Sequence, residues 1–490
     1  MEKKKKVGFA SSFGFIMAAA GSAVGLGNLW GFPYKTAKGG GAAFVFIYIL
    51  CVLFLGFIAM LTEMHIGKRA QANPITAYKS INKKFGWVGL FAVVVPFFIT
   101  CYYSVLGGWT VKYAVNSFKG NSGIIGTFSV DTVQVVLFTA VFIGLALLII
   151  AGGVEGGIEK LSKALMPTLF VILIGIVIYS LCLGEGVKEG LAFYLKPDFS
   201  AITFSTVLLA MGQAFFSLSI GMGILVTYGS YCGKDINLVK STGMICLFDT
   251  LVAFLAGLAI FPAVAHFDAS LLDGSKGVAL MYVILPEVFD SMGFAGKIVS
   301  FFFFAMVAIA AITSIISLYE VCTQFVIQKF HVKRVKAIAA VSVVSFAISI
   351  PVGISLGHVG ILEESGPALF GLDWLTFFDE VTNTLAMPLC ALMSCVLVGW
   401  VLKPGKAVEE MKAQGSSFAP WLEKAYKVFV KYITPILILV VEVGGIRNEI
   451  AAGNAAVVIG AVILVVLSIA VYFVAFVNSE TGTNEDEKVA

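Results

Sequence analysis

Charged residues are scarce in this chain. Asp, Glu, Lys and Arg supply 13% of its 490 residues, while 59% are hydrophobic. A soluble globular domain typically carries about 25% charged residues and about 45–50% apolar ones. The mean hydropathy of +0.97 agrees with this imbalance. The composition therefore excludes an ordinary soluble protein and predicts a membrane protein with several spanning segments.

Patterns that hold metals, nucleic acids or reacting groups are also lacking. The chain has four histidines and eight cysteines without metal-ligand spacing, so we expect neither a zinc site nor a disulfide framework, and cysteines that fill the core. The Lys and Arg residues are scattered between apolar runs, and a net charge of +4 arranged in this way predicts no nucleic-acid partner. No nucleophile and base form a recognisable set, so we do not expect an enzyme.

Twelve windows of the sequence are long and apolar enough to cross a bilayer. They fall near 10–35, 42–67, 88–118, 133–151, 164–183, 202–231, 241–265, 296–328, 337–356, 374–402, 428–446 and 455–477. With both termini cytoplasmic, most of the 33 Lys and Arg residues lie on the cytoplasmic side, as the positive-inside rule requires. The longest outer loop, near 266–296, contains a proline and several apolar residues, which predicts a lid instead of a slack linker.

Glycines interrupt two of these windows. The first window contains the segment 21–28 (GSAVGLGN), and the sixth contains 217–223 (SLSIGMG). Each glycine weakens helical pairing at a depth where no water replaces a lost hydrogen bond, so such a break is expected to line a site. Close helix packing through small residues is the alternative for either segment alone, but the matched pair favours a site.

The positions of the two breaks also predict the architecture. Five spans separate the starts of the broken spans, and because five is odd, the second set of five crosses the membrane in the opposite sense. We therefore expect an all-α integral membrane fold with a 5+5 inverted repeat over 10–200 and 201–402, followed by spans eleven and twelve within 403–477. In this scheme residues 1–9 form a cytoplasmic tail and 478–490 an acidic tail.

A few polar side chains lie at the depth of the breaks. A break frees backbone carbonyls, and the next half-helix presents free N–H groups and a positive dipole end, so a cation and a carboxylate fit together there. Asn28, Ser217 and Asp249 add oxygen atoms that suit a hard cation. The alternatives are a structural hydrogen bond for Asp249, and bonds to their own helix for Thr313 and Ser314.

Three segments of the chain resemble a known family. Residues 21–34 (GSAVGLGNLWGFPY), 216–223 (FSLSIGMG) and 431–435 (KYITP) are similar to the neurotransmitter:sodium symporter family, in its bacterial amino-acid transporter branch. The resemblance runs from about residue 6 through the twelfth span and implies twelve transmembrane helices with helices 1 and 6 broken. The rule that paired broken helices mark a binding site was drawn in part from this family, so it is not independent support.

The resemblance also implies which residues form the sites. The substrate would meet Ala23, Gly25, Gly27, Ile99, Tyr103, Phe216, Ser219, Met222, Ser314 and Leu318. Two sodium ions are the implied coupling ions. The first would meet Ala23, Asn28, Ser217 and Asp249, and the second would meet Gly21, Val24, Ala310, Thr313 and Ser314. The outer gate would be formed by Tyr103, Phe216 and Asp379.

The chain departs from the family pattern at both gates. Gly31 stands where arginine is common, so the usual arginine–carboxylate pair with Asp379 cannot form, and Lys35, one helical turn further on, is the candidate substitute. At the inner gate the usual arginine, tryptophan and aspartate are replaced by Lys6, Phe9 and Gln328. We therefore expect a looser inner gate than the family pattern implies.

The function that the resemblance implies is sodium-coupled import of an amino acid by alternating access. The implied pocket holds no charged side chain, which predicts a neutral, medium-to-large apolar or aromatic L-amino acid. Chloride should be unnecessary, because Asp249 supplies a fixed negative charge and Ala253, one turn later, has no group that binds an anion. The expected partners are the amino acid, sodium and the lipid bilayer of the cell membrane.

Other functions stay open from the sequence alone. One is sodium-coupled transport of a small amino acid, glycine or alanine. Another is a channel or a transport-dead sensor on the same scaffold. A channel should show a continuous polar stripe, whereas the polar residues here gather at the two breaks with aromatic residues above them.

Overall fold

The computed structural model describes residues 8–233, 235–273, 280–361 and 366–477. Helices dominate this part of the chain, and its one strand-type pairing is an isolated bridge between Leu369 and Leu372. The all-α prediction is therefore confirmed. Lys6 and the acidic tail at 478–490, both singled out from the sequence, lie outside the described residues.

The first half of the chain contains five spans with short connecting helices. The first span consists of α1 (Ser12–Ala23), η1 (Gly27–Gly31) and α2 (Phe32–Lys38). The second consists of α3 (Ala42–Cys51), η2 (Val52–Gly56) and α4 (Phe57–Ala70), and α5 (Pro74–Ile81) and η3 (Lys83–Phe85) lead to the third, α6 (Gly86–Asn116). After α7 (Ile125–Phe128) come α8 (Thr132–Ala151), then η4 (Val154–Glu159) with α9 (Lys160–Leu181) as the fifth span.

The second half repeats this arrangement after α10 (Val187–Leu195) and η5 (Phe199–Ala201). The sixth span is α11 (Phe204–Ser217) with α12 (Ile224–Ser230), and the seventh is α13 (Leu238–Asp268), continued by η6 (Ala269–Asp273). Next come η7 (Leu280–Ile284), α14 (Leu285–Ser291), α15 (Gly293–Phe330), and α16 (Arg334–Ser355) with η8 (Leu356–Ile361). The tenth span is made of α17 (Trp374–Asp379), η9 (Glu380–Ala386), α18 (Met387–Val396) and η10 (Leu397–Leu402).

Two further spans complete the described chain. A short helix, α19 (Pro404–Ala413), is followed by α20 (Pro420–Val428), η11 (Phe429–Ile433) and α21 (Thr434–Ala451), and then by α22 (Ala455–Tyr472) and η12 (Phe473–Val477). By length and hydropathy, ten described helical segments qualify as membrane spans. The pair Ser12–Ala23 and Gly27–Lys38, bent by 50°, and the shorter apolar helix Phe204–Ser217 supply the two broken spans. The prediction of twelve transmembrane helices is confirmed.

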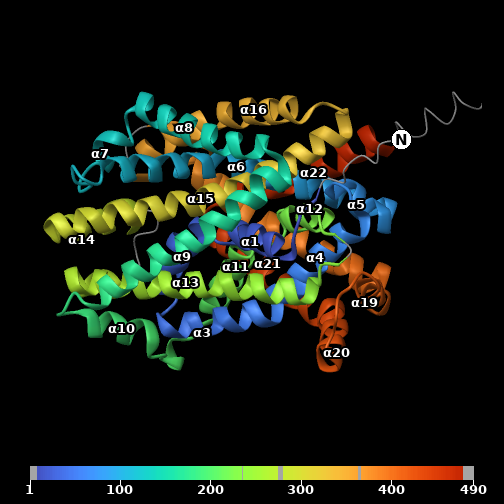
Figure 1. The fold of residues 1–490 in the computed structure, drawn as a ribbon, viewed down its shortest axis with the longest axis horizontal. Helices are drawn as coiled ribbons and strands as arrows, with labels where there is room; N and C mark the ends of the chain where they lie inside the picture. Colours follow the sequence, from blue (N-terminus) through green and yellow to red (C-terminus); the bar gives the residue numbers. More distant parts are fainter. Residues whose placement is uncertain (1–7, 234, 274–279, 362–365, 478–490) are drawn as a thin grey trace, which may run out of the picture.

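The broken first span lies in the middle of the bundle. Figure 1 shows α1 surrounded by α9, α13, α15 and α6, and contacts of α1 with α9, α13 and α15 agree with this view. α10 and α14 lie at one end of the bundle, and α5, α19 and α20 lie at the other (Figure 1). In the apolar 18-residue window of the span around α6, 83% of the residues are buried, against 22% for the span around α22, so the third span belongs to the core and the twelfth to the rim.

Each break has a backbone conformation that a helix does not allow. α1 ends at Val24, which is extended with ψ 104°. Between α11 and α12, Ser219, Gly221 and Gly223 have φ of 55°, 79° and 67°, in the left-handed region where glycine is favoured. A Cβ on Gly221 would also lie 2.2 Å from the carbonyl oxygen of Met387. The glycines therefore allow both the turn and the close approach of the neighbouring span.

The described part of the loop at 266–296, which the sequence predicts to be a lid on the outer side, packs against the bundle. Within its described part, Met281 and Tyr282 are buried, and the Tyr282 hydroxyl donates to the Leu106 carbonyl at 2.9 Å. The Tyr113 hydroxyl donates in turn to the Tyr282 carbonyl at 2.7 Å. The loop is thereby fixed to the third span. Residues 274–279 of this loop are not among the described ones.

Candidate functional site

The two breaks face each other, and hydroxyl groups satisfy the carbonyls that they free. The carbonyl oxygen of Ser22 accepts hydrogen bonds from Ser219 Oγ at 3.2 Å and from Ser314 Oγ at 3.1 Å. Ser314 Oγ also lies 3.3 Å from the Val24 carbonyl oxygen. The first, sixth and eighth spans therefore meet at one point, where free backbone groups are buried among side chains that compensate them.

The residues of the proposed first sodium site form one hydrogen-bonded cluster. Ser217 Oγ lies 2.9 Å from both carboxylate oxygens of Asp249, and Asn28 Nδ2 donates to Asp249 Oδ1 at 2.7 Å. Asn28, Ser217 and Asp249 are completely or almost completely buried. Three of the four predicted residues, Asn28, Ser217 and Asp249, are thus brought together, and their side chains carry oxygen atoms that suit a hard cation.

One detail of this cluster differs from the expectation that Asn28 offers its amide oxygen. Asn28 Oδ1 accepts the Gly25 N–H at 3.0 Å, and it is the amide nitrogen that faces Asp249. A sodium ion ligated by the amide oxygen beside Asp249 requires the amide to turn over. In this structure the Asp249 carboxylate is compensated by the neighbouring donors, namely the Asn28 amide and the Tyr48 and Ser217 hydroxyls.

The proposed second sodium set is also brought together around the first break. A Cβ on Gly21 would lie 3.3 Å from the Thr313 Cβ, so the first and eighth spans touch here. The Thr313 hydroxyl donates to the Ala310 carbonyl at 2.9 Å within its own helix, which is the alternative that the sequence left open for this residue. Ser314 instead bonds across to the break, as described above.

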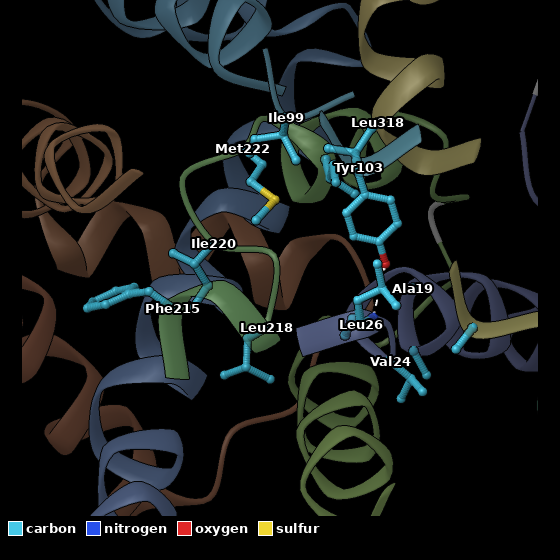
Figure 2. Packing of buried hydrophobic residues seen from close by; sticks show 14 of the residues in the cluster. Ala19, Val24, Leu26, Ile99, Tyr103, Phe215, Leu218, Ile220, Met222 and Leu318 are labelled. Carbon is cyan, nitrogen blue, oxygen red and sulfur yellow. Dashed lines mark hydrogen bonds between the residues drawn. The ribbon is translucent and has the colours of Figure 1, made fainter. Parts of the chain in front are cut away.

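A small cavity lies between the breaks and contains the whole predicted substrate set. Its volume is about 20 Å³, and it is lined by Ser22, Ala23, Gly25, Gly27, Ile99, Tyr103, Phe216, Ser219, Met222, Ile224, Ser314 and Leu318. Figure 2 shows Ile99, Met222 and Leu318 close to the ring of Tyr103. No charged side chain takes part in this lining. One side of the cavity is polar backbone and hydroxyl, and the other is apolar.

Tyr103 connects the cavity to the first break. The Leu26 N–H donates to the Tyr103 hydroxyl at 3.0 Å, shown as the dashed line in Figure 2. The hydroxyl oxygen is therefore an acceptor in this contact. Glycine is required beside it, because a Cβ on Gly25 would lie 2.7 Å from the Tyr103 hydroxyl and 2.4 Å from Ser314 Oγ.

Phe216 separates the cavity from a wide outer vestibule. The half-buried ring of Phe216 lines both spaces, and the vestibule has a volume of about 1050 Å³. Its wall includes Gly31, Lys35 and Asp379. Lys35 Nζ lies 5.9 Å from the centroid of the Phe216 ring, and Asp379 Oδ1 accepts a hydrogen bond from Asn383 at 2.8 Å. Lys38 lines the same vestibule, but Lys35, the candidate substitute, is the basic group over the Phe216 ring.

Two buried carboxyl groups contact protein groups, as acidic residues at membrane depth generally do. Glu63 Oε1 accepts the Gly221 N–H at 3.0 Å, which ties the second span to the break in the sixth. Glu320 accepts the Tyr231 hydroxyl at 2.6 Å and pairs with Arg334. All the cysteines except Cys182 are buried, and none is in a disulfide, as expected for core residues.

Sequence reasoning missed four residues of the site. Ser22 and Ile224 line the cavity, the Tyr48 hydroxyl donates to Asp249 Oδ2 at 3.1 Å, and Gln213 Nε2 donates to the Gly27 carbonyl at 2.8 Å. Ser22 lies inside the break segment itself, so its position was the available signal. A lone tyrosine in an apolar run carries no signal of its own, because aromatic packing explains it equally well.

The chain was compared with known proteins. A family model described as the sodium:neurotransmitter symporter family matches residues 6–123 and 126–478. An uncharacterized sodium-dependent transporter, YhdH of Bacillus subtilis, is 34% identical over 457 residues, covering 90% of this chain and 98% of the relative. A second uncharacterized sodium-dependent transporter, from Haemophilus influenzae, is 33% identical and covers 89% of this chain and 98% of its own.

A solved structure has the same fold. The crystal structure of MhsT in complex with L-phenylalanine aligns with a TM-score of 0.82 at 36% identity, covering 90% of this chain and 100% of the other. Members of the matching family are secondary transporters, so the expectation that this chain is not an enzyme is confirmed. The paired breaks, the buried oxygen cluster and the match over nearly the whole length agree. This multi-pass membrane protein belongs to the sodium:neurotransmitter symporter family.

Proposed function

We propose that this protein is a sodium-coupled importer of a neutral, medium-to-large apolar or aromatic L-amino acid that works without chloride. Sodium-dependent transport follows from membership of the family. The proposal of an amino-acid substrate depends mainly on the cavity between the breaks. The polar side of this cavity consists of the backbone around Gly25 and the Tyr103 hydroxyl. The positive dipole end of the half-helix that follows the break and a phenolic hydroxyl are suited to a carboxylate.

The apolar side of the cavity supports the choice of substrate. Ile99, Met222 and Leu318 would meet the substrate side chain, and a charged side chain among them would be buried without a partner. Met222 is unbranched and flexible, so it is able to move aside for a ring. The solved structure of MhsT contains L-phenylalanine, which supports the same class of ligand.

The cavity volume favours a second candidate, a small amino acid. About 20 Å³ is room for roughly one water-sized probe, so a bulky side chain enters only if the lining moves. Glycine or alanine would require a smaller movement. Phe216 and Met222 are the residues that have to give way for the larger substrate, because Phe216 is half-buried and Met222 is flexible.

The surroundings of Asp249 support independence from chloride. Its carboxylate already receives the donors that an anion at this place would need, namely the Tyr48 and Ser217 hydroxyls and the Asn28 amide. Ala253, one turn later, adds no polar group. A fixed carboxylate and a bound chloride would also repel each other in a medium of low dielectric constant.

We propose in addition that both termini are cytoplasmic, with α5, α19 and α20 at the cytoplasmic end of the bundle and α10 and α14 at the outer end. The support is the positive-inside rule. The basic residues assigned to the cytoplasmic side are Lys68, Arg69, Lys79, Lys83, Lys84, Lys329, Lys333, Arg334 and Lys336. In the following, the inner end means the end at which α1 begins.

Competition of unlabelled amino acids against radiolabelled leucine or phenylalanine in proteoliposomes tests the proposal. We expect uptake in sodium but not in choline medium, and competition by leucine, tyrosine, phenylalanine and tryptophan. Competition by glycine and alanine alone would favour the small-substrate candidate. Equal uptake in sodium and choline would contradict sodium coupling.

A further inference from the structure

A carboxylate at the inner end joins the first span to the fifth. Glu159, the last residue of η4, has a side chain that is 1% exposed. Its oxygens accept hydrogen bonds from the Ala10 N–H at 2.7 Å, from the Ser11 hydroxyl at 2.9 Å and from Lys163 Nζ at 2.6 Å. Two of these donors belong to the residues that precede α1. The contact therefore fixes the start of the broken helix to its neighbour.

The start of α1 is shaped to receive this carboxylate. Ser11 is the N-cap of α1, and its Oγ accepts the Gly14 N–H at 3.0 Å. An anion is favoured here because the free N–H groups and the positive end of the helix dipole meet. Gly14 leaves the necessary room, since a Cβ there would lie 1.9 Å from Glu159 Oε1.

Gln328 and Phe9, which stand where the family usually has an aspartate and a tryptophan at the inner gate, do not supply a charge to the start of α1 in the described contacts. Gln328 Oε1 accepts both the backbone N–H and the side-chain amide of Asn73, at 2.9 and 2.7 Å. It therefore holds the segment after α4 and not the start of α1. Phe9 packs edge-on against Tyr228 and Tyr231, and its N–H donates to the Tyr231 carbonyl at 3.2 Å. The charge that holds the start of α1 within the described chain comes from Glu159.

This contact lies between an open groove and the first break. The groove has a volume of about 910 Å³ and is lined by Gly8, Ala10, Gly152, Val154, Glu155, Gly156, Glu159, Lys160, Lys163 and Ala164. Further along α9, Met166 Sδ lies 3.3 Å from where a Cβ on Gly21 would stand. Gly21 belongs to the proposed second sodium set. Separation of α1 from α9 at Glu159 would thus extend the groove toward the ion site.

We propose that Glu159 is the inner latch of the transport cycle, whose carboxylate holds the start of α1 closed and releases it when the site opens inward. Glu159 is a positioning residue, because it contacts neither the cavity nor the proposed sodium sets. The inference rests on the proposed transport by alternating access, which needs a closure on the inner side that breaks and forms again. The charge is essential, since charge-assisted hydrogen bonds are about twice as strong as neutral ones.

A native cysteine reports on this closure. Cys232 is 2% exposed and follows Tyr231, one of the two tyrosines that Phe9 covers. Its Sγ lies 3.6 Å from the Tyr228 carbonyl oxygen. Release of the start of α1 uncovers this corner and exposes the thiol. Cys182 is already exposed and serves as the reference within the same molecule.

The experiment is labelling of the full-length protein with a hydrophilic maleimide, followed by mass spectrometry of each cysteine. Glu159→Gln should raise the labelling rate of Cys232 relative to Cys182 by on the order of tenfold, because the weaker contact shifts the population toward the open state. Lys160→Gln is the matched control, since Lys160 is exposed and lines the same groove. It should label like the wild type.

Ser11→Ala removes one of the two donors before α1 and should give an intermediate rate. It keeps the test decisive if Glu159→Gln does not fold. Unchanged labelling of Cys232 in the folded Glu159 variant, or in the Ser11 variant alone, overturns the proposal. The labelling needs no substrate, so it tests the latch separately from the proposed function. If Cys232 reacts faster in the Glu159→Gln variant but the wild type takes up no amino acid, the proposed latch stands and the proposed substrate is wrong.

Discussion

The side-chain amide nitrogen of Asn28 lies 2.7 Å from Oδ1 of Asp249, although 221 residues separate the two. This contact joins the first break to the seventh span. The opposite end of the same amide accepts the Gly25 N–H at 3.0 Å. A sodium ion beside Asp249 would take the place of the amide N–H on the carboxylate. At the proposed first sodium site, the ion and the amide nitrogen would therefore compete for one negative charge, and this competition would couple the break to sodium.

Removal of either proposed sodium ligand should raise the sodium concentration that gives half-maximal uptake. We expect a rise of at least about tenfold for Asn28→Ala and for Thr313→Ala, because a hydrogen-bonding group on a charged partner contributes roughly 1.5–3 kcal/mol. Sodium titration of uptake in proteoliposomes measures the change. Thr168→Ala is the control, since the exposed Thr168 hydroxyl bonds only to its own helix at Ala164 in the described contacts. If both variants show the sodium dependence of the wild type, the proposed sodium ligands are wrong.

Replacement of chloride by gluconate should leave uptake within about twofold of its normal rate, since the fixed charge of Asp249 already balances the cations. The double change Asp249→Asn with Ala253→Ser removes that charge and adds a hydroxyl one turn away. It should make uptake depend on chloride. Ala253→Ser alone retains the carboxylate and is the control that should stay independent of chloride. Wild-type uptake that collapses in gluconate contradicts the charge-balance argument.

Met222→Phe should shift the preference of the transporter toward smaller substrates. The side chain of Met222 lines the cavity with Ile99 and Leu318, and a rigid ring there leaves less room than the flexible thioether. We expect the affinity for tryptophan to fall by about fivefold or more, as overpacking typically costs roughly 1–3 kcal/mol. Competition by tryptophan and by alanine measures the shift. Met393→Phe, at a half-buried methionine outside the cavity lining, should change neither.

The sequence predicts the breaks because glycine at membrane depth is a strong local signal, whereas the substrate set is implied by the family resemblance. Gly25, Gly27 and Gly221 were marked in this way, and the structure explains each by a close contact. Tyr48 was not marked, since a tyrosine in an apolar run is equally consistent with packing. Glu159 was not marked either, because a carboxyl group at the end of a span looks like an ordinary polar flank. Its partners, the residues before α1, become visible only when the first and fifth spans are placed together.

The outer gate gives the last prediction. Gly31 offers no side chain, and Lys35 instead stands over the Phe216 ring, with Nζ 5.9 Å from its centroid, in the vestibule that also contains Asp379. A cation over a partly exposed aromatic ring contributes about 0.5–1 kcal/mol, so Lys35→Met should speed dissociation of bound substrate about two- to fivefold. Dissociation of radiolabelled substrate in sodium medium measures this.

Lys35→Arg retains the cation and should dissociate like the wild type. Lys38→Met is the matched control, because Lys38 is exposed and lies over Tyr34 instead of Phe216. Since Phe216 separates the cavity from the vestibule, a cation that steadies its ring slows escape outward without touching the substrate. Equal dissociation rates for Lys35→Met and Lys38→Met would show that Lys35 does not replace the missing arginine, and that the ring closes through its apolar contacts alone.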